Sequence, residues 1–212
     1  MRIFRHINEL ISRLDKIDIL DSNFIYPYSS NKSEKRIQIW DNMQKGILLE
    51  DKQILIPWQT PFNRLNNFKE KRRDSGDRTE WYLGKRTFID GYVSDIEIMK
   101  WFWVPWSNPI TRISNKIGFD YEGLENFIFL KEHITNLLGA PTITEIEKFG
   151  SFDLGHIIWQ NKKVEISLVG IEIFNCRYSL NIGLIHDNNK EYFDNMIKDL
   201  KAGGLSEEEL GK

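Results

Sequence analysis

The sequence predicts an α+β fold, with antiparallel sheets of about seven to nine strands and three main helices that are N-terminal, central and C-terminal. Three segments place apolar residues at the spacing of one helical face, and the runs between them have the alternating or β-branched pattern of strands. Successive strand runs are separated by about two to four residues, which is too short for the crossover that parallel strands need. The strands are therefore expected to be antiparallel.

The chain has 212 residues, which fits one domain over residues 1–202 followed by a loosely held tail over residues 203–212. A division into two subdomains near residues 105–119 is the alternative. The formal net charge of −2 does not favour binding to a polyanion such as DNA. A single cysteine excludes an internal disulfide and suits a cytoplasmic location.

Residues 1–20 are expected to form the first helix, because their apolar residues fall on one helical face. The stretch is too short and too often interrupted by charges to span a bilayer, and its polar face carries both signs, so we expect no membrane partner. The apolar positions are Ile3, Ile7, Leu10, Leu14 and Ile17.

A loop over residues 21–35 and a strand over residues 36–40 are expected next, followed by a hairpin of residues 46–50 and 53–58. Residues 63–77 are the most polar stretch and are expected to form a charged loop.

A meander is expected over residues 79–83, 86–90 and 93–104, with Gly84 in the first turn. A central helix should follow over residues 121–138, where Asp120 is placed to cap its start and Gly139 to end it. Gly170 predicts a bulge or bend in the second of the strands that come next. These strands are expected over residues 154–160, 163–174 and 177–185, before a third helix over residues 190–200.

The catalytic motifs of nucleotide hydrolysis and of dinucleotide redox chemistry are absent from the sequence. The four histidines, at positions 6, 133, 156 and 186, have no spacing typical of a metal site, so we interpret them as structural or surface residues. Cys176 lies beside Arg177, whose charge could activate a thiolate, but a packed and inert thiol is the simpler interpretation. We therefore expect no cofactor and assign no catalytic or metal-binding residue.

An aromatic segment, WFWVPW over residues 101–106, is the most distinctive feature of the chain. In a strand, Trp101 and Trp103 would project to one face, where exposed aromatic side chains make good binding anchors. Packing of the segment inside a core is the alternative. The candidate aromatic binding residues are Trp101, Trp103, Trp106, Trp81 and Tyr82.

A basic cluster over residues 69–78, with Lys71, Arg72 and Arg73 at its centre, offers a weak nucleic-acid site, for which a solvated charged loop is the ordinary explanation. Acidic residues near the aromatic segment leave open a carbohydrate-active or other hydrolase that uses two carboxylates beside a tryptophan platform. Its candidate acids are Asp90, Asp95 and Glu97.

The C-terminal half, over residues 124–185, resembles small bacterial proteins of unknown function, among them immunity proteins encoded beside polymorphic secreted toxins. The residues that carry the resemblance are Leu137, Leu138, Gly139, Ala140, Pro141, Phe152, Gly155, Trp159 and the runs 164–174 and 178–185.

The resemblance implies a cytoplasmic protein that binds another protein and occludes a toxin's active site. The leading expectation is therefore a non-enzymatic bacterial binding protein of the immunity type, whose interface uses aromatic anchors within a charged rim. The hydrolase and the nucleic-acid binder remain the alternatives.

Overall fold

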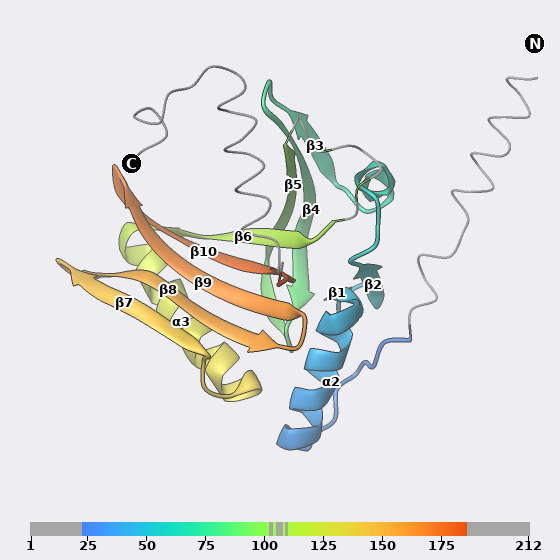
Figure 1. The fold of residues 1–212 in the computed structure, drawn as a ribbon, viewed down its shortest axis with the longest axis horizontal. Helices are drawn as coiled ribbons and strands as arrows, with labels where there is room; N and C mark the ends of the chain where they lie inside the picture. The colour runs from blue at the N-terminus through green and yellow to red at the C-terminus, as the bar shows by residue number, and fades with distance from the viewer. Residues whose placement is uncertain (1–22, 102–103, 105–107, 109, 186–212) are drawn as a thin grey trace, which may run out of the picture.

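A computed structural model describes residues 23–101, 104, 108 and 110–185 of the chain. These residues form an α+β structure built on one eight-stranded antiparallel sheet and a separate two-stranded hairpin (Figure 1). The strand order of the large sheet is β3-β4-β5-β6-β10-β9-β8-β7. The antiparallel arrangement expected from the short connections is confirmed, because every pairing in the sheet is antiparallel.

Two meanders of four strands share this sheet, and they join where β6 pairs with β10. The two blocks of strands separated by the central helix therefore belong to a single sheet. The first meander consists of β3 (Lys71–Asp74), β4 (Arg78–Phe88), β5 (Tyr92–Trp101) and β6 (Arg112–Phe119). The second consists of β7 (Ile143–Phe149), β8 (Phe152–Asn161), β9 (Val164–Ile173) and β10 (Asn175–Leu184).

The central helix α3 (Asp120–Leu138) carries the chain from β6, in the middle of the sheet, to β7 at its edge. Its buried face packs on the sheet, where the Phe127 ring lies 5.2 Å from the ring of Tyr178 on β10. The predicted helix is confirmed. Gly139 follows it with a φ of 96°, a conformation that a side chain would disfavour.

The helix α2 (Lys32–Lys45) occupies the segment where a strand was expected over residues 36–40, so that prediction was wrong. The Asn31 side chain accepts hydrogen bonds from the N–H groups of Ser33 and Glu34, at 3.0 and 3.1 Å, and so caps the first turn. Ile39, Trp40 and Met43 are buried from successive turns of the helix. The alternation of polar and apolar residues from Arg36 to Trp40 was thus part of a helical pattern.

The hairpin expected after this segment is confirmed as β1 (Gly46–Leu49) and β2 (Ile54–Pro57). The indole N–H of Trp58 donates to the carbonyl of Met43, at 2.7 Å, and this bond fixes the hairpin against α2. A short 3-10 helix, η1 (Phe62–Asn67), leads from the hairpin to β3.

The meander after η1 differs from the prediction in where it turns. β4 is one continuous strand with a register shift at Tyr82 to Gly84, so Gly84 lies in a bulge and the predicted turn there was wrong. The turn comes at Ile89 to Gly91, where all three residues have positive φ. The charged loop expected over residues 63–77 instead contains η1 and the edge strand β3.

Two strands, β6 and β7, lie where no strand was expected, in segments read as connections on either side of the central helix. The three strands expected after them are confirmed as β8, β9 and β10. Gly170 lies in an unbroken register rather than at a bulge. Its role is close packing, since a Cβ there would lie 2.8 Å from the Asp153 carbonyl oxygen and 3.0 Å from the Tyr178 ring.

The described residues contain two long helices, α2 and α3. The helices expected over residues 1–20 and 190–200, and the tail over residues 203–212, lie outside the described residues. No described helix is long and apolar enough to cross a membrane.

Candidate functional site

The pairing register assigns side chains to the two faces of the large sheet, because residues directly opposite each other in an antiparallel pair share a face. Tyr178, Leu180 and their partners form the face on which α3 packs, which we call the covered face. The opposite face carries no described helix, and we call it the open face. One row across the open face runs through Lys71, Tyr82, Glu97, Ser114, Asn181, Ser167, Ile158 and Ile143.

At the β3–β5 end of the open face, seven side chains form a group that we call the platform. Lys71 lies opposite Tyr82, Arg73 lies opposite Glu80, and Arg78 lies opposite Trp101. The platform consists of Lys71, Arg73, Arg78, Glu80, Tyr82, Met99 and Trp101. Strand alternation therefore collects four of the eight predicted binding residues, Lys71, Arg73, Tyr82 and Trp101, on one surface.

Glu80 organises the centre of the platform, although it is only 4% exposed. Its carboxylate accepts hydrogen bonds from Nε of Arg78 and from the hydroxyl of Tyr82, both at 2.6 Å. Burial alone raises the pKa of Glu80, but these two hydrogen bonds outweigh it, so the pKa lies below its ordinary value. The hydrogen bond to Glu80 in turn raises the pKa of the Tyr82 hydroxyl. At neutral pH the platform centre is thus an ionised carboxylate held by a guanidinium and a neutral phenol.

Trp101 and Met99 supply the apolar surface of the platform, with exposures of 37% and 36%. The Arg78 guanidinium carbon lies 5.9 Å from the centroid of the Trp101 ring, within the range of a cation–π interaction. Because Glu80 also holds Arg78, this arginine is fixed in place over the aromatic ring. Such an ordered tryptophan and arginine pair is the composition found at the centre of many protein interfaces.

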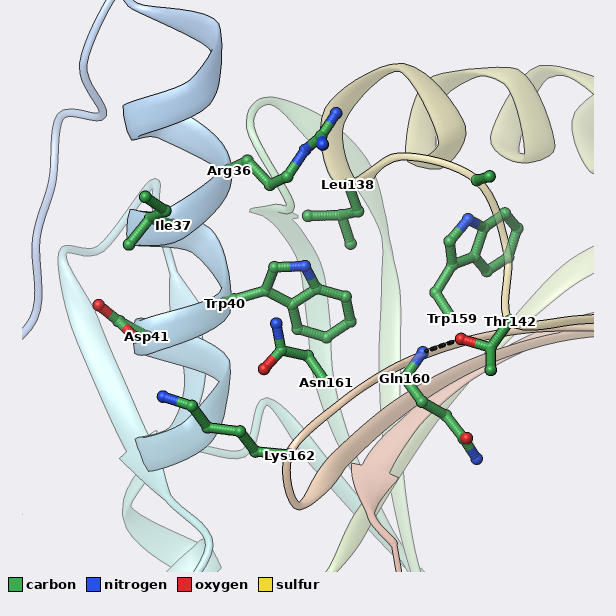
Figure 2. Close-up of a pocket in the computed structure, with 11 residues that line it drawn as sticks. Arg36, Ile37, Trp40, Asp41, Leu138, Thr142, Trp159, Gln160, Asn161 and Lys162 are labelled. Atoms are coloured by element: carbon green, nitrogen blue, oxygen red, sulfur yellow. Dashed lines mark hydrogen bonds between the residues drawn. The ribbon is translucent and has the colours of Figure 1, made fainter.

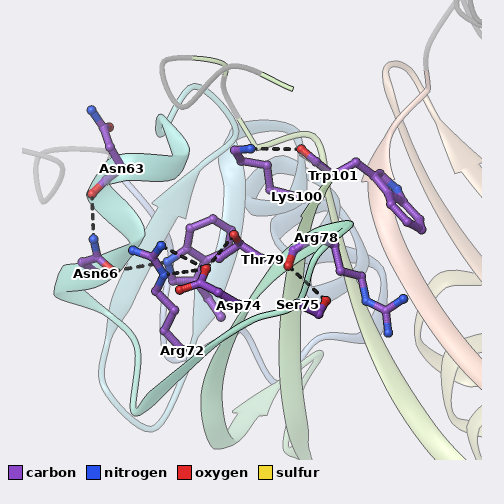
Figure 3. A network of polar contacts seen from close by, with 10 residues as sticks. Asn63, Asn66, Arg72, Asp74, Ser75, Arg78, Thr79, Lys100 and Trp101 are labelled. Atoms are coloured by element: carbon purple, nitrogen blue, oxygen red, sulfur yellow. Dashed lines mark hydrogen bonds and ion pairs between the residues drawn. The ribbon is translucent and has the colours of Figure 1, made fainter. Parts of the chain in front are cut away.

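Trp81 lies on the covered face with 0% exposure and cannot be an exposed anchor, which corrects its place among the binding candidates. Its ring stacks on Phe62 of η1, with centroids 5.5 Å apart, and its N–H donates to Asn66, at 3.4 Å. Arg72 is also directed to this face, where it lies over the Trp81 ring. It donates to Asp74, as Figure 3 shows. The remaining candidates, Trp103 and Trp106, lie outside the described residues.

The basic cluster over residues 69–78 is therefore divided between the two faces, and this does not favour a continuous phosphate-binding track. Arg72 pairs with Asp74 at 3.0 Å, and Arg78 pairs with both Glu80 and Asp77, at 2.6 and 3.7 Å. Each pair offsets one of the cations that nucleic-acid binding would need.

Three platform residues, Arg78, Glu80 and Met99, were not among the predicted binding residues. The signal that could have found them is the period of two along β4 and β5. Arg78, Glu80 and Tyr82 alternate along one strand, as do Met99 and Trp101 along the next.

Of the four histidines, His133 and His156 have contacts with other residues, whereas His6 and His186 lie outside the described residues. Nε2 of His133 lies 2.9 Å from the carbonyl of Ile89, and His156 lies 3.6 Å from Glu145. Burial raises the pKa of the Cys176 thiol, and the charges of Glu172 and Asp120 raise it further. Within the described residues no group of three or more His, Cys, Asp or Glu side chains is arranged to hold a metal ion.

A pocket of about 360 Å³ lies between α2 and the turn that joins β8 to β9 (Figure 2). Trp40, Leu138 and Trp159 form its apolar wall, and Arg36 lies at its rim, where Nε donates to the carbonyl of Leu137. Asp41 is the one carboxylate that lines it. The pocket therefore offers shape and apolar surface without a second acid for general acid–base catalysis.

A second pocket, at the β7–β8 edge, is lined by Glu145, Glu147 and His156 but by no tryptophan. Neither this pocket nor the one beside α2 is lined by Trp101. Of the acids proposed for a hydrolase, Asp90 forms an ion pair with Lys35, at 2.9 Å. The arrangement expected of a glycosidase, two carboxylates across a cleft lined by Trp101, is thus absent from these two pockets.

Comparison of the chain with protein-family models, with curated proteins and with solved structures gives no match.

Proposed function

We propose that this chain is a non-enzymatic bacterial protein-binding domain of the immunity type, which presents the open face of its large sheet to a partner toxin. The observation that carries the proposal is the platform, where aromatic and arginine side chains gather on a face that no described helix covers. A sheet face with this composition is suited to a flat protein surface rather than to a small molecule.

The anchor of the interface is Trp101, with Met99 beside it and Arg78 held over its ring. The Arg78 side chain loses little conformational freedom on binding, because Glu80 already holds it. Lys71, Arg73 and Glu97 lie further along the same face, on one side of the anchor, and supply charges of both signs to a polar rim. The partner surface is accordingly expected to offer an apolar pocket for the indole and a mixed polar border.

Inhibition follows from occlusion. A partner seated on the platform would have its own catalytic surface covered by the sheet, without any bond being made or broken by this chain. The resemblance of residues 124–185 to immunity proteins agrees with this mode of action.

The proposal is tested by co-expressing the chain with the product of the neighbouring gene. Wild-type chain is expected to co-purify with that product and to suppress its toxicity. Met99→Asp and Trp101→Ala are each expected to weaken the complex by tenfold or more, since each removes apolar surface that the partner would cover. Isothermal titration with the purified pair gives the affinities.

Ile128→Asp is the matched control, because Ile128 is an exposed apolar residue of α3, away from the open face. It should bind like wild type, and thermal melting should show that all three variants are folded. No complex and unchanged toxicity with wild type would overturn the proposed function. A complex that Trp101→Ala and Met99→Asp leave intact would show instead that another surface binds.

A further inference from the structure

The two edges of the eight-stranded sheet have opposite charge. β3 forms one edge and has the sequence KRRD, whereas β7 forms the other and has the sequence ITEIEKF. Neither has a second neighbouring strand among the described residues, so each presents one side of its backbone for further pairing. An edge of this kind is a template for the addition of another strand.

The oppositely charged side chains of the two edges also lie on the same face of the sheet. Lys71 and Arg73 lie on the open face, and the pairing register carries Glu145 to the same face through His156, Val169 and Ser179. Glu147 lies two residues further along β7, on the same side as Glu145. A second copy placed edge to edge would therefore continue both faces of the sheet without a break.

One antiparallel register pairs β3 of one copy with β7 of the next so that opposite charges meet. Lys71 then lies opposite Glu147 of the next copy, Arg73 opposite Glu145, and Arg72 opposite Ile146. Glu70, which extends β3 by a backbone hydrogen bond to Tyr82, lies opposite Lys148. No like charges face each other in this register.

Symmetric pairing of either edge with itself is disfavoured by the same side chains in the registers centred on Arg72 of β3 and on Ile146 of β7. Two β3 strands centred on Arg72 would place Lys71 against Arg73 and Arg72 against itself. Two β7 strands centred on Ile146 would place Glu145 against Glu147 twice. Like charges directly opposite each other are destabilising, so the charges that block symmetric pairing leave head-to-tail pairing open.

We propose that copies of this chain associate head to tail, with the β3 edge of one pairing with the β7 edge of the next. The overlap is about six residues, from Glu70 to Ser75, so the contact is small and the association is weak and dependent on concentration. Salt should weaken it further, because the charges at both edges are exposed to solvent. Such a contact does not close on itself by symmetry, and so it can add further copies.

Two double variants test the proposal by sedimentation equilibrium from micromolar to millimolar protein, at low and at high salt. Lys71→Glu with Arg73→Glu makes both edges acidic, and Glu145→Lys with Glu147→Lys makes both basic. Each variant alone is expected to associate at least tenfold more weakly than wild type. An equimolar mixture of the two should regain association at low salt, because acidic edges then meet basic ones.

Recovery on mixing cannot come from misfolded protein, and so it separates edge pairing from damage to the fold. Controls with the same change in net charge are Lys52→Glu with Lys131→Glu, and Glu125→Lys with Glu132→Lys, all at exposed positions of the hairpin turn or α3. These should associate like wild type. A monomeric wild type, equal loss in the controls, or a mixture that stays monomeric would each overturn the proposal.

Discussion

The guanidinium of Arg72 lies over the indole ring of Trp81, with its central carbon 5.9 Å from the ring centroid. Its Nε and Nη2 also donate to Asp74, at 3.1 and 3.0 Å. These contacts hold Arg72 on the covered face, while Lys71 and Arg73 on either side of it belong to the open face. A run of three basic residues is in this way divided between a packing role and a surface role.

Trp81 and Trp101 should differ sharply in their contribution to stability. Trp81→Ala is expected to lower the free energy of unfolding by about 3–5 kcal/mol, because it leaves a cavity in the core beside Phe62. Trp101→Ala should cost less, about 2 kcal/mol or below, because 37% of the residue is exposed and its removal leaves no cavity in the core. Urea denaturation measures both, and similar losses would contradict the assignment of the two residues to different faces.

Gly170 should not tolerate a methyl group. Gly170→Ala is expected to cost about 1–3 kcal/mol, because the new Cβ would press on the Asp153 carbonyl and on the buried Tyr178 ring. Gly76→Ala is the matched control, since a Cβ there meets nothing within 4 Å, and its effect should be within about 0.5 kcal/mol. Equal stability of the two variants in urea would argue against this close approach of β9 to β8 and β10.

Glu50 should make the stability depend on pH. Its buried carboxylate accepts hydrogen bonds from the N–H groups of Asp90 and Gly91, at 2.7 and 2.9 Å, and so holds the turn between β4 and β5. Burial raises its pKa, although these bonds oppose the rise. The folded chain therefore binds this proton more tightly than the unfolded chain does.

The contribution of Glu50 is consequently greatest below the ordinary pKa of a glutamate and is lost as pH rises through the raised value. The stability of wild type relative to Glu50→Gln should increase as pH falls from neutral into this range. Chemical denaturation of both proteins across pH gives the difference. A relative stability that falls with decreasing pH would contradict the raised pKa.

Cys176 should resist thiol reagents in the folded chain. It is 4% exposed on the covered face, burial raises its pKa, and the neighbouring Arg177 is directed to the opposite face. Reaction with 5,5′-dithiobis(2-nitrobenzoate) is expected to be slow and to accelerate in urea together with unfolding. Rapid reaction of the native protein would revive the interpretation of Cys176 as a nucleophile.

The sequence by itself determined the elements whose signals are local. The hairpin around Asp51 and the helix that ends at Leu138, just before Gly139, were predicted because turn residues and apolar spacing are sufficient for them. The antiparallel arrangement also followed from the short connections. These features depend on neighbours within a few residues, and so a single sequence contains them.

Tertiary structure decided the elements whose local patterns were ambiguous. The five residues Arg36 to Trp40 alternate like a strand, but packing of Ile39, Trp40 and Met43 selects a helix. Gly84 resembles a turn, yet β4 continues through it because β5 pairs on both sides of the bulge. The polar strand β6 forms because β10, which is distant in sequence, supplies its hydrogen bonds. β7 pairs with β8 across a tight turn, and this hairpin was missed because β7 has few apolar residues.

The candidate site, too, was predictable from the sequence only in part. The residue types of the platform are visible in the sequence, and alternation along a strand predicts which of them share a face. Which face remains open, and hence that Trp81 is core and Trp101 is surface, was decided only when α3 and η1 packed on one side of the sheet. The physical reason is that burial depends on contacts between segments far apart in the chain, which no local pattern specifies.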